Sequence, residues 1–286
     1  MTISIGRLAR PASRQILRRQ GSAIPILCGL VILLVLFLAC FGQLLAPHSP
    51  TQPNQAWAYV GPTDGHPLGF DSQGRDILSR LLAGAQTSIF APTIITLVAV
   101  VTGTVLGISA AWFGGRIDTV ISSVLDLVFS FPGMLLAILG AAIFGQGPVA
   151  PVLALSIAYT PLLARIVRSA AIRERTKDYI VAAELQGLSG LTVCFRHMFP
   201  NILPVVVAQG TLVFGYSIAD FAAVSYLGLG VQPPAPDWGI MASGGQLGLL
   251  LGYPTESLSA SLLIVLVVVA VNVLGEWMLE RKEMIR

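Results

Sequence analysis

The chain has 286 residues, of which 55% are hydrophobic and only 11% are charged, and its formal net charge is +3. Soluble domains carry about 25% charged residues, so this composition excludes an ordinary soluble protein and predicts one integral membrane domain. The small net charge gives no reason to expect nucleic-acid binding. The three cysteines form no CxxC or CxxH pattern, so they indicate neither a disulfide framework nor a metal site.

Six apolar segments are long enough to cross a bilayer, which requires about 20 residues. Prolines and polar residues interrupt the third and fourth segments, and the first is longer than the core of a cleavable signal peptide. The sequence therefore predicts an all-α integral membrane protein whose six transmembrane helices form one domain, residues 24–280. The expected spans are 24–46, 88–113, 119–145, 149–171, 202–230 and 258–280.

Basic residues predict the orientation, because Lys and Arg favour the cytoplasmic side of a membrane. With the N-terminus inside, 15 of the 17 Lys and Arg residues fall on inner segments, and only Arg75 and Arg80 fall outside. We therefore expect both termini in the cytoplasm. A basic segment, 1–23, precedes the membrane domain, and a short tail, 281–286, follows it.

The first outer connection, about 47–87, begins rich in proline and polar residues and ends with apolar residues on one helical face. This pattern predicts a short amphipathic helix at the outer interface. Asp71 or Ser72 is expected to cap its start, and Gly84 is expected to stop it.

Two further connections are long. The second outer connection, about 231–257, is rich in turn residues, and its Trp238 is suited to the membrane interface. The longest inner connection, about 172–201, contains the stretch "YIVAAELQGLSGLTVCFRHMFPN", in which glycines and charged residues interrupt apolar ones. Gly187 and Gly190 are expected to break this stretch into two short helices.

The faces of these two helices are suited to contact. Ala182 and Ala183, followed by Gly187, are expected to place small residues on one face of the first helix, so another backbone can approach it closely. The second helix is expected from about 189 to 199, with Pro200 ending it, and carries an apolar face beside two basic side chains: Leu191, Phe195 and Met198, with Arg196 and His197. From these residues alone, a docking element for a cytoplasmic partner and a helix resting on lipid headgroups are equally good interpretations.

Several motifs resemble those of one transporter family. The inner stretch resembles the E-A-A-x-x-x-G signature of permeases in ATP-binding-cassette (ABC) importers; Ala182, Ala183, Gly187 and Pro200 match it, and Val181 replaces the usual Glu. The segments "HPLGFDSQGRDILSRLLAGAQTS", "VLDLVFSFPGMLLAI" and "SYLGLGVQPPAPDWGIM" resemble further motifs of the dipeptide, oligopeptide and nickel branch. They are most similar to the second permease of its pair, the dipeptide permease C type.

The resemblance implies the ABC importer type I permease fold and a multi-pass location in the bacterial cytoplasmic membrane. It implies peptide import by alternating access, with a second homologous permease as heterodimer partner, two cytoplasmic ATP-binding subunits or domains, and an extracytoplasmic solute-binding protein. The chain itself would be no enzyme and bind no cofactor, because ATP and Mg belong to the ATPase partners. The implied ATPase-coupling residues are Ala182, Ala183, Gly187, Leu191, Phe195, Arg196, His197 and Pro200.

Ionisable residues inside a membrane are candidates for function. Asp126 lies near the inner end of the third span, where a hydrogen bond to a neighbouring helix is favoured over a role in gating. Asp220 lies deeper in the fifth span, and either lines the translocation path or sits at a helix seam. His48, His66 and His197 are expected on opposite membrane sides or far apart, so no catalytic or metal site is predicted.

Three other functions fit the sequence less well. The same machine could carry nickel or another small solute. A membrane-embedded enzyme would require paired catalytic groups at one depth, whereas Asp126 and Asp220 are expected at different depths. A stand-alone secondary transporter usually contains inverted repeats, and the sequence contains no convincing repeat.

Overall fold

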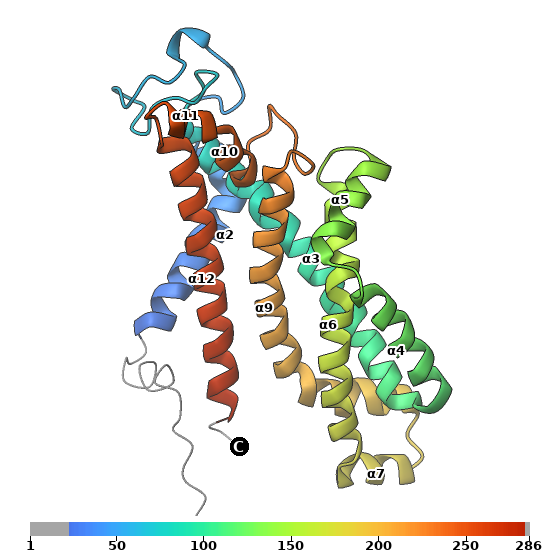
Figure 1. The fold of residues 1–286 in the computed structure, drawn as a ribbon. Coiled ribbons are helices and arrows are strands. Elements are labelled where there is room, and N and C mark those ends of the chain that lie inside the picture. Colours follow the sequence, from blue (N-terminus) through green and yellow to red (C-terminus); the bar gives the residue numbers. More distant parts are fainter. Residues whose placement is uncertain (1–22, 284–286) are drawn as a thin grey trace, which may run out of the picture.

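The computed structural model describes residues 23–283, and all elements named in this range are helical (Figure 1). Most are α-helices; η1 is a short 3-10 helix and η2 is π-helical. The elements are α2 (Ala23–Leu45), η1 (Gln55–Trp57), α3 (Ile77–Phe113), α4 (Gly115–Phe129), α5 (Gly133–Phe144), α6 (Val149–Arg175), α7 (Asp178–Leu185), α8 (Gly190–Thr192), η2 (Val193–Met198), α9 (Phe199–Tyr226), α10 (Trp238–Gly244), α11 (Gln246–Leu250) and α12 (Thr255–Glu283).

Five helices in the described part of the chain are long and apolar enough to cross a membrane: α2, α3, α6, the continuous α8–η2–α9, and α12. Helices α4 and α5 are long and apolar enough only as a pair, which is bent by 78° and counts as a sixth span when taken together. The bend lies next to Pro132, which has no backbone N–H and disfavours helix in the residue before it. Five of the six expected spans are therefore confirmed, and the third corresponds to this bent pair.

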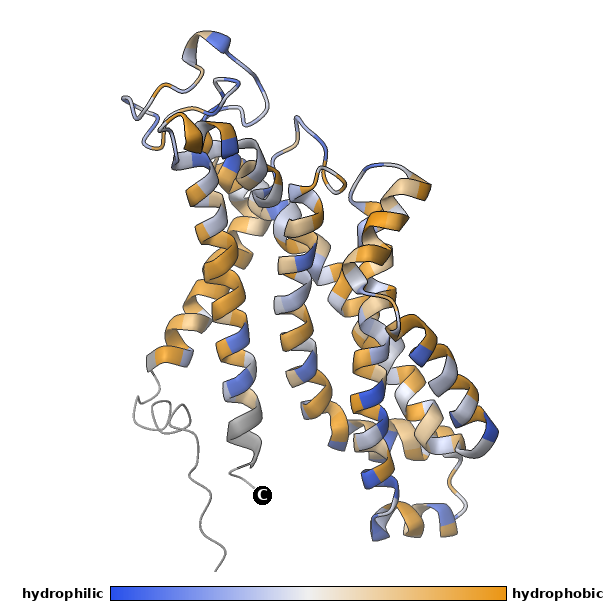
Figure 2. Ribbon diagram, viewed as in Figure 1, coloured by the Kyte–Doolittle hydropathy of each residue, from blue (hydrophilic) through white to orange (hydrophobic). Residues whose placement is uncertain are grey.

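The membrane helices alternate in direction, so their connections gather at two ends of the molecule (Figure 1). Residues 46–76 and 227–254 lie at one end, which we call the outer cap. The 176–198 connection and the end of α12 lie at the other end, which we call the inner end. In Figure 2, hydrophobic residues dominate the middle of the long helices, and hydrophilic residues concentrate in the 46–76 loop and at the inner end of α6.

The predicted amphipathic helix at the outer interface is wrong. Its residues are the first turns of α3, which runs without interruption from Ile77 to Phe113 and buries Ile77 and Leu81 in the outer cap. Asp76, not Asp71 or Ser72, is the N-cap, because its side chain accepts a hydrogen bond from the Ser79 backbone. Gly84 does not stop the helix.

Close packing explains both Gly84 and Trp238. A Cβ on Gly84 would lie 3.3 Å from the backbone nitrogen of Asp237, so this glycine lets the 227–254 connection approach α3. Trp238 is buried and its indole N–H donates to the Leu81 carbonyl at 3.0 Å, so the prediction that it lies at the membrane interface is wrong. Burial raises the pKa of the neighbouring Asp237, although hydrogen bonds from Ser88 and from backbone N–H groups oppose this shift.

Small residues join α3 to α6 in the centre of the bundle. A Cβ on Gly103 would lie 2.8 Å from Leu163 Cβ, and one on Gly107 would lie 2.7 Å from the Ala164 carbonyl oxygen. The "GTVLG" segment therefore allows close contact between helix backbones, as small residues do in other membrane bundles. This seam fixes α6, from which the inner connection departs.

Candidate functional site

The inner connection begins with α7, which ends at a glycine turn. Gly187 has a φ of +79°, a left-handed conformation that side-chain-bearing residues rarely adopt. Leu188 N–H donates to the Ala183 carbonyl and Gly187 N–H donates to the Glu184 carbonyl, the two hydrogen bonds of a Schellman motif. No atom lies within 4 Å of a Cβ built on Gly187, so this position requires a conformation rather than close contact.

Gly190 has the complementary role. Its own φ is unremarkable, but a Cβ there would lie 2.7 Å from Nε1 of Trp112, at the inner end of α3. Ser189 caps the new helix by accepting a hydrogen bond from Thr192 N–H at 3.3 Å. The predicted interruption is therefore real, but it is a single turn between α7 and α8: Gly187 makes the turn, whereas Gly190 is the first residue of the next helix and allows its contact with Trp112.

The helix that follows is not ended by Pro200, as the sequence predicted. It passes through a π-helical stretch, Val193–Met198, in which the Phe199 N–H donates to the Cys194 carbonyl five residues earlier, and then continues as α9. Pro200 is the second residue of α9, directly after the π-helical stretch, and the helix runs through it. Elements α8, η2 and α9 thus form one continuous helix, Gly190–Tyr226, which includes the fifth membrane span.

The predicted apolar face is only partly correct. Leu191 and Phe195 are 72% and 69% exposed, whereas Met198 is completely buried in a core that includes Ile180 and Val193. The α-helical spacing i, i+4, i+7 places the three on one face, but the wider π-helical turn rotates the later residues, so Met198 points inward. Of the basic pair, Arg196 is exposed and His197 is half-buried.

Other residues of the segment also differ from expectation. Ala183 is buried against the same core, while Ala182 is exposed, so they do not share one contact face. Leu185 and Leu188, which the sequence reasoning missed, are exposed; the exposed fraction of Leu185 is 84%. The leucines flanking the glycines in "ELQGLSGL" were the available signal. We call Leu185, Leu188, Leu191 and Phe195 the exposed apolar set.

Hydrogen bonds join the segment to α6. The Tyr179 hydroxyl donates to the buried carboxylate of Glu174 and accepts from the Asn201 side chain, which also donates to the His197 carbonyl. Burial, followed by the bond to Glu174, raises the pKa of Tyr179 to about 12. Lys177 forms an ion pair with Glu174 at 2.8 Å. The end of α6, the start of α7 and the start of α9 are thereby linked.

A second attachment joins the segment to α3. Arg175, the last residue of α6, donates to the carbonyls of Ala111 and Trp112, and its guanidinium lies 5.0 Å from the Trp112 ring centroid. Trp112 in turn packs on Gly190. The 176–198 connection is therefore held against α3, α6 and α9.

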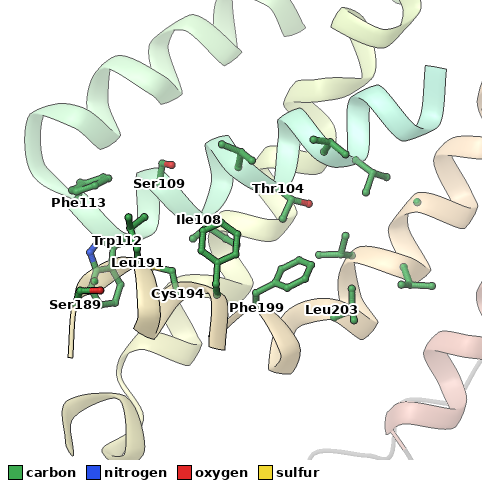
Figure 3. A pocket seen from close by; sticks show the side chains of 18 residues that line it. Thr104, Ile108, Ser109, Trp112, Phe113, Ser189, Leu191, Cys194, Phe199 and Leu203 are labelled. Atoms are coloured by element: carbon green, nitrogen blue, oxygen red, sulfur yellow. The ribbon is translucent and has the colours of Figure 1, made fainter. Parts of the chain in front are cut away.

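An apolar groove runs between α3 and the α8–η2–α9 helix (Figure 3). Its volume is about 740 Å³. Trp112, Phe113 and Ile108 line the α3 side, and Leu191, Cys194, Phe199 and Leu203 line the other. Leu191 and Phe195 of the exposed apolar set thus lie at this groove as well as at the inner surface.

The two membrane carboxylates lie at helix seams and have different partners. Asp126 of α4 pairs with Arg165 of α6 at 2.8 Å, and its side chain is 65% exposed. Asp220 of α9 accepts a hydrogen bond from the Tyr159 hydroxyl of α6 at 2.7 Å. The structure does not bring the two acids together.

A family profile described as "binding-protein-dependent transport system inner membrane component" matches residues 103–282 of the chain. The chain belongs to this family. This permease chain is 36% identical to the glutathione transport system permease protein of Pectobacterium atrosepticum; the match covers 92% of the chain and 86% of that relative. The chain is also 36% identical to the dipeptide transport system permease protein of Alkalihalophilus pseudofirmus; this match covers 87% of the chain and 82% of that relative.

The fold of the permease is also found among solved structures. An inward-facing structure of the MetNI methionine ABC transporter matches 71% of the permease and 95% of the matched chain, with a TM-score of 0.57 and 19% sequence identity. This likeness confirms the expected type I importer fold. With its membrane helices and family, the permease is a multi-pass protein of the bacterial inner membrane.

One expectation about histidines is wrong. His48 and His66 were expected not to meet, yet their rings stack in the outer cap of the permease with centroids 4.0 Å apart. The 46–76 loop begins after α2 and folds back on itself before α3, which brings the two residues together. His66 Nδ1 also lies 2.9 Å from Oδ1 of Asp76, while His197 lies at the inner end.

Proposed function

We propose that this permease is one of two homologous permease subunits of an ABC importer that moves di- or oligopeptides into the cytoplasm. The observation that carries the proposal is the inner segment, a short helix and a glycine turn that present exposed apolar side chains while fixed to three membrane helices. A surface loop resting on lipid would not require attachments to Trp112, Glu174 and Asn201.

The inner segment acts as the coupling site. The exposed apolar set, with Arg196 beside it, seats in a groove of a cytoplasmic ATPase; Ala182, Ala183, Gly187, His197 and Pro200 shape the segment. Closure of the ATPases on ATP and Mg moves the segment as a rigid lever. Because the segment is fixed to α3, α6 and α9, the lever changes how these helices pack and exchanges an inward for an outward opening.

The orientation follows from charge. The inner end holds most Lys and Arg residues, so it faces the cytoplasm together with both termini. In a background without the native cysteines, a cysteine at Gln186 should react with an impermeant reagent only from inside, and one at Gln73 only from outside. Both positions are exposed in the structure. Labelling of both from outside would overturn this orientation.

The substrate assignment rests on the relatives, whose names describe dipeptide, di/tripeptide and glutathione transport. The branch that the sequence resembles also includes nickel importers. Uptake of a radiolabelled dipeptide by cells that carry the complete importer, with unlabelled dipeptide, glutathione or Ni²⁺ as competitors, separates these substrates. Absence of dipeptide uptake by an importer that takes up Ni²⁺ would contradict the peptide assignment.

The partners are tested by co-purification. Solubilised permease should retain a sister permease and ATP-binding subunits or domains, and a solute-binding protein loaded with peptide should stimulate ATP hydrolysis by the assembly. The permease alone should hydrolyse no ATP. A permease that transports peptide in liposomes without any ATPase would contradict the proposal.

A further inference from the structure

We propose that His48, His66 and Asp76 form a binding site for one first-row divalent cation, best matched by Zn²⁺, in the outer cap of the permease. The site lies at the opposite end from the coupling segment. The inference does not depend on the transported solute or on the ATPase partners.

The ligand atoms are already close enough for one ion. His66 Nδ1 lies 2.9 Å from Asp76 Oδ1, and His48 Nδ1 lies 4.0 Å from Asp76 Oδ2. One ligand atom from each of the three residues lies within 4.8 Å of the other two. Tetrahedral zinc with bonds of about 2.0–2.2 Å requires ligand atoms about 3.3–3.6 Å apart, with the ion in the plane of each imidazole. The His48 ring, which is partly exposed and stacked on His66, must therefore turn about its side-chain bonds to complete the site.

A buried serine holds two of the ligands in place. Ser79 donates both its backbone N–H and its hydroxyl to Asp76 Oδ2, and its hydroxyl oxygen accepts the backbone N–H of His48 at 3.1 Å. The carboxylate and the His48 backbone are therefore oriented by the same residue. Hydrogen bonds from outside the ligand set that fix its members are typical of metal sites.

The third ligand is held by its own turn. His66 exchanges two backbone hydrogen bonds with Thr63, and its ring packs between His48 and Phe70. The three ligands thus come from three segments: the chain just after α2, the 63–66 turn, and the residue before α3. An ion bound there would link the outer ends of α2 and α3 through the loop between them.

The donor set selects the kind of ion. Two imidazole nitrogens and one carboxylate oxygen suit Zn²⁺, Ni²⁺ or Cu²⁺, whereas Mg²⁺ and Ca²⁺ prefer sets made of oxygen. The His48 side chain is 41% exposed, so an ion can enter from water and can complete its coordination with water. His48 Nδ1 and Asp76 Oδ2 lie 4.0 Å apart, which is too far for a hydrogen bond. An ion bound to both side chains would bridge this gap.

The site is tested by metal titration of the purified full-length permease in detergent, with a histidine-free affinity tag and after chelator treatment. Co²⁺ serves as the spectroscopic probe and Zn²⁺ as the competitor. Wild-type protein should bind one equivalent, show the absorption bands of low-symmetry Co²⁺, and melt at a higher temperature with Zn²⁺ present.

Matched variants separate the site from general histidine binding. His48→Phe and His66→Phe keep an aromatic ring for stacking but remove a ligand, so each should weaken Zn²⁺ binding by at least about tenfold. His197→Phe removes the histidine at the inner end and should bind as wild type does. Because His48 is partly exposed, His48→Phe tests the ligand without disturbing folding. The proposal is overturned if wild-type protein binds no stoichiometric Zn²⁺, or if His48→Phe binds it equally well.

Discussion

Gly190 packs so closely on Trp112 that a Cβ at this glycine would lie 2.7 Å from the indole Nε1. Three residues earlier, Gly187 faces open space but has a φ of +79°. The two glycines of the 176–198 connection therefore differ in their surroundings: Gly190 allows a close contact, and Gly187 adopts a left-handed conformation. Substitutions can separate these features.

At Gly187, the residue type should matter through the left-handed conformation. Valine at this φ is a strong outlier, and a side chain in this region costs roughly 1–2 kcal/mol. Gly187→Val should abolish peptide uptake at normal membrane abundance, whereas Gly187→Asn should retain most of it, since asparagine adopts this conformation readily. Equal uptake by the two variants would contradict a conformational role.

Phe195 should contribute directly to ATPase binding. Burying a Phe side chain stabilises an interface by roughly 1.5–3 kcal/mol, so Phe195→Asp should weaken ATPase binding at least about tenfold in detergent pull-down. Leu250 is 83% exposed at the outer cap, and Leu250→Asp is the matched control that should leave the ATPase bound. Full retention of the ATPase by Phe195→Asp, with normal stimulation by the binding protein, would mean that the segment only rests on the membrane.

Met198 and Leu191 should differ in their effect on stability. Met198 is fully buried, so Met198→Ala should lower the free energy of unfolding by about 2–5 kcal/mol through the cavity that it leaves. Leu191 is 72% exposed, and Leu191→Ala should change stability by no more than about 0.5 kcal/mol. Unfolding in detergent measures both. Similar losses for the two variants would place both residues on the apolar face that the sequence predicts.

Asp237 should make the stability of the outer cap depend on pH. Its pKa is raised by burial, so the folded state binds more protons than the unfolded state between the ordinary value, about 3.9, and the raised one. The contribution of Asp237 to the free energy of unfolding is therefore greatest below this pH range and falls as pH rises through it. When melting temperature is measured at a series of pH values, Asp237→Asn should remove this part of the decline. An unchanged dependence of melting temperature on pH would contradict the prediction.

The sequence predicts the membrane spans well because each depends on a local property, the length of an apolar run. It also locates the interruption of the inner connection, because Gly187 supplies a left-handed turn that a local glycine signals. It places Met198 wrongly because a π-helical turn changes the helical period, and Trp238 wrongly because tertiary packing covers it. The meeting of His48 with His66 depends on the path of a whole loop, which no local pattern encodes.

The length of α3 determines where the outer cap lies relative to lipid. A helix of 37 residues is about 55 Å long, whereas the hydrocarbon core of a bilayer is about 30 Å thick. Even at a tilt of 40°, the helix would rise about 42 Å along the membrane normal. If Phe113 lies at the inner edge of the hydrocarbon, Ile77 stands about 12 Å beyond its outer edge. The first turns of α3 then project beyond the hydrocarbon and hold His48, His66 and Asp76 in the aqueous phase, where dissolved ions can reach them.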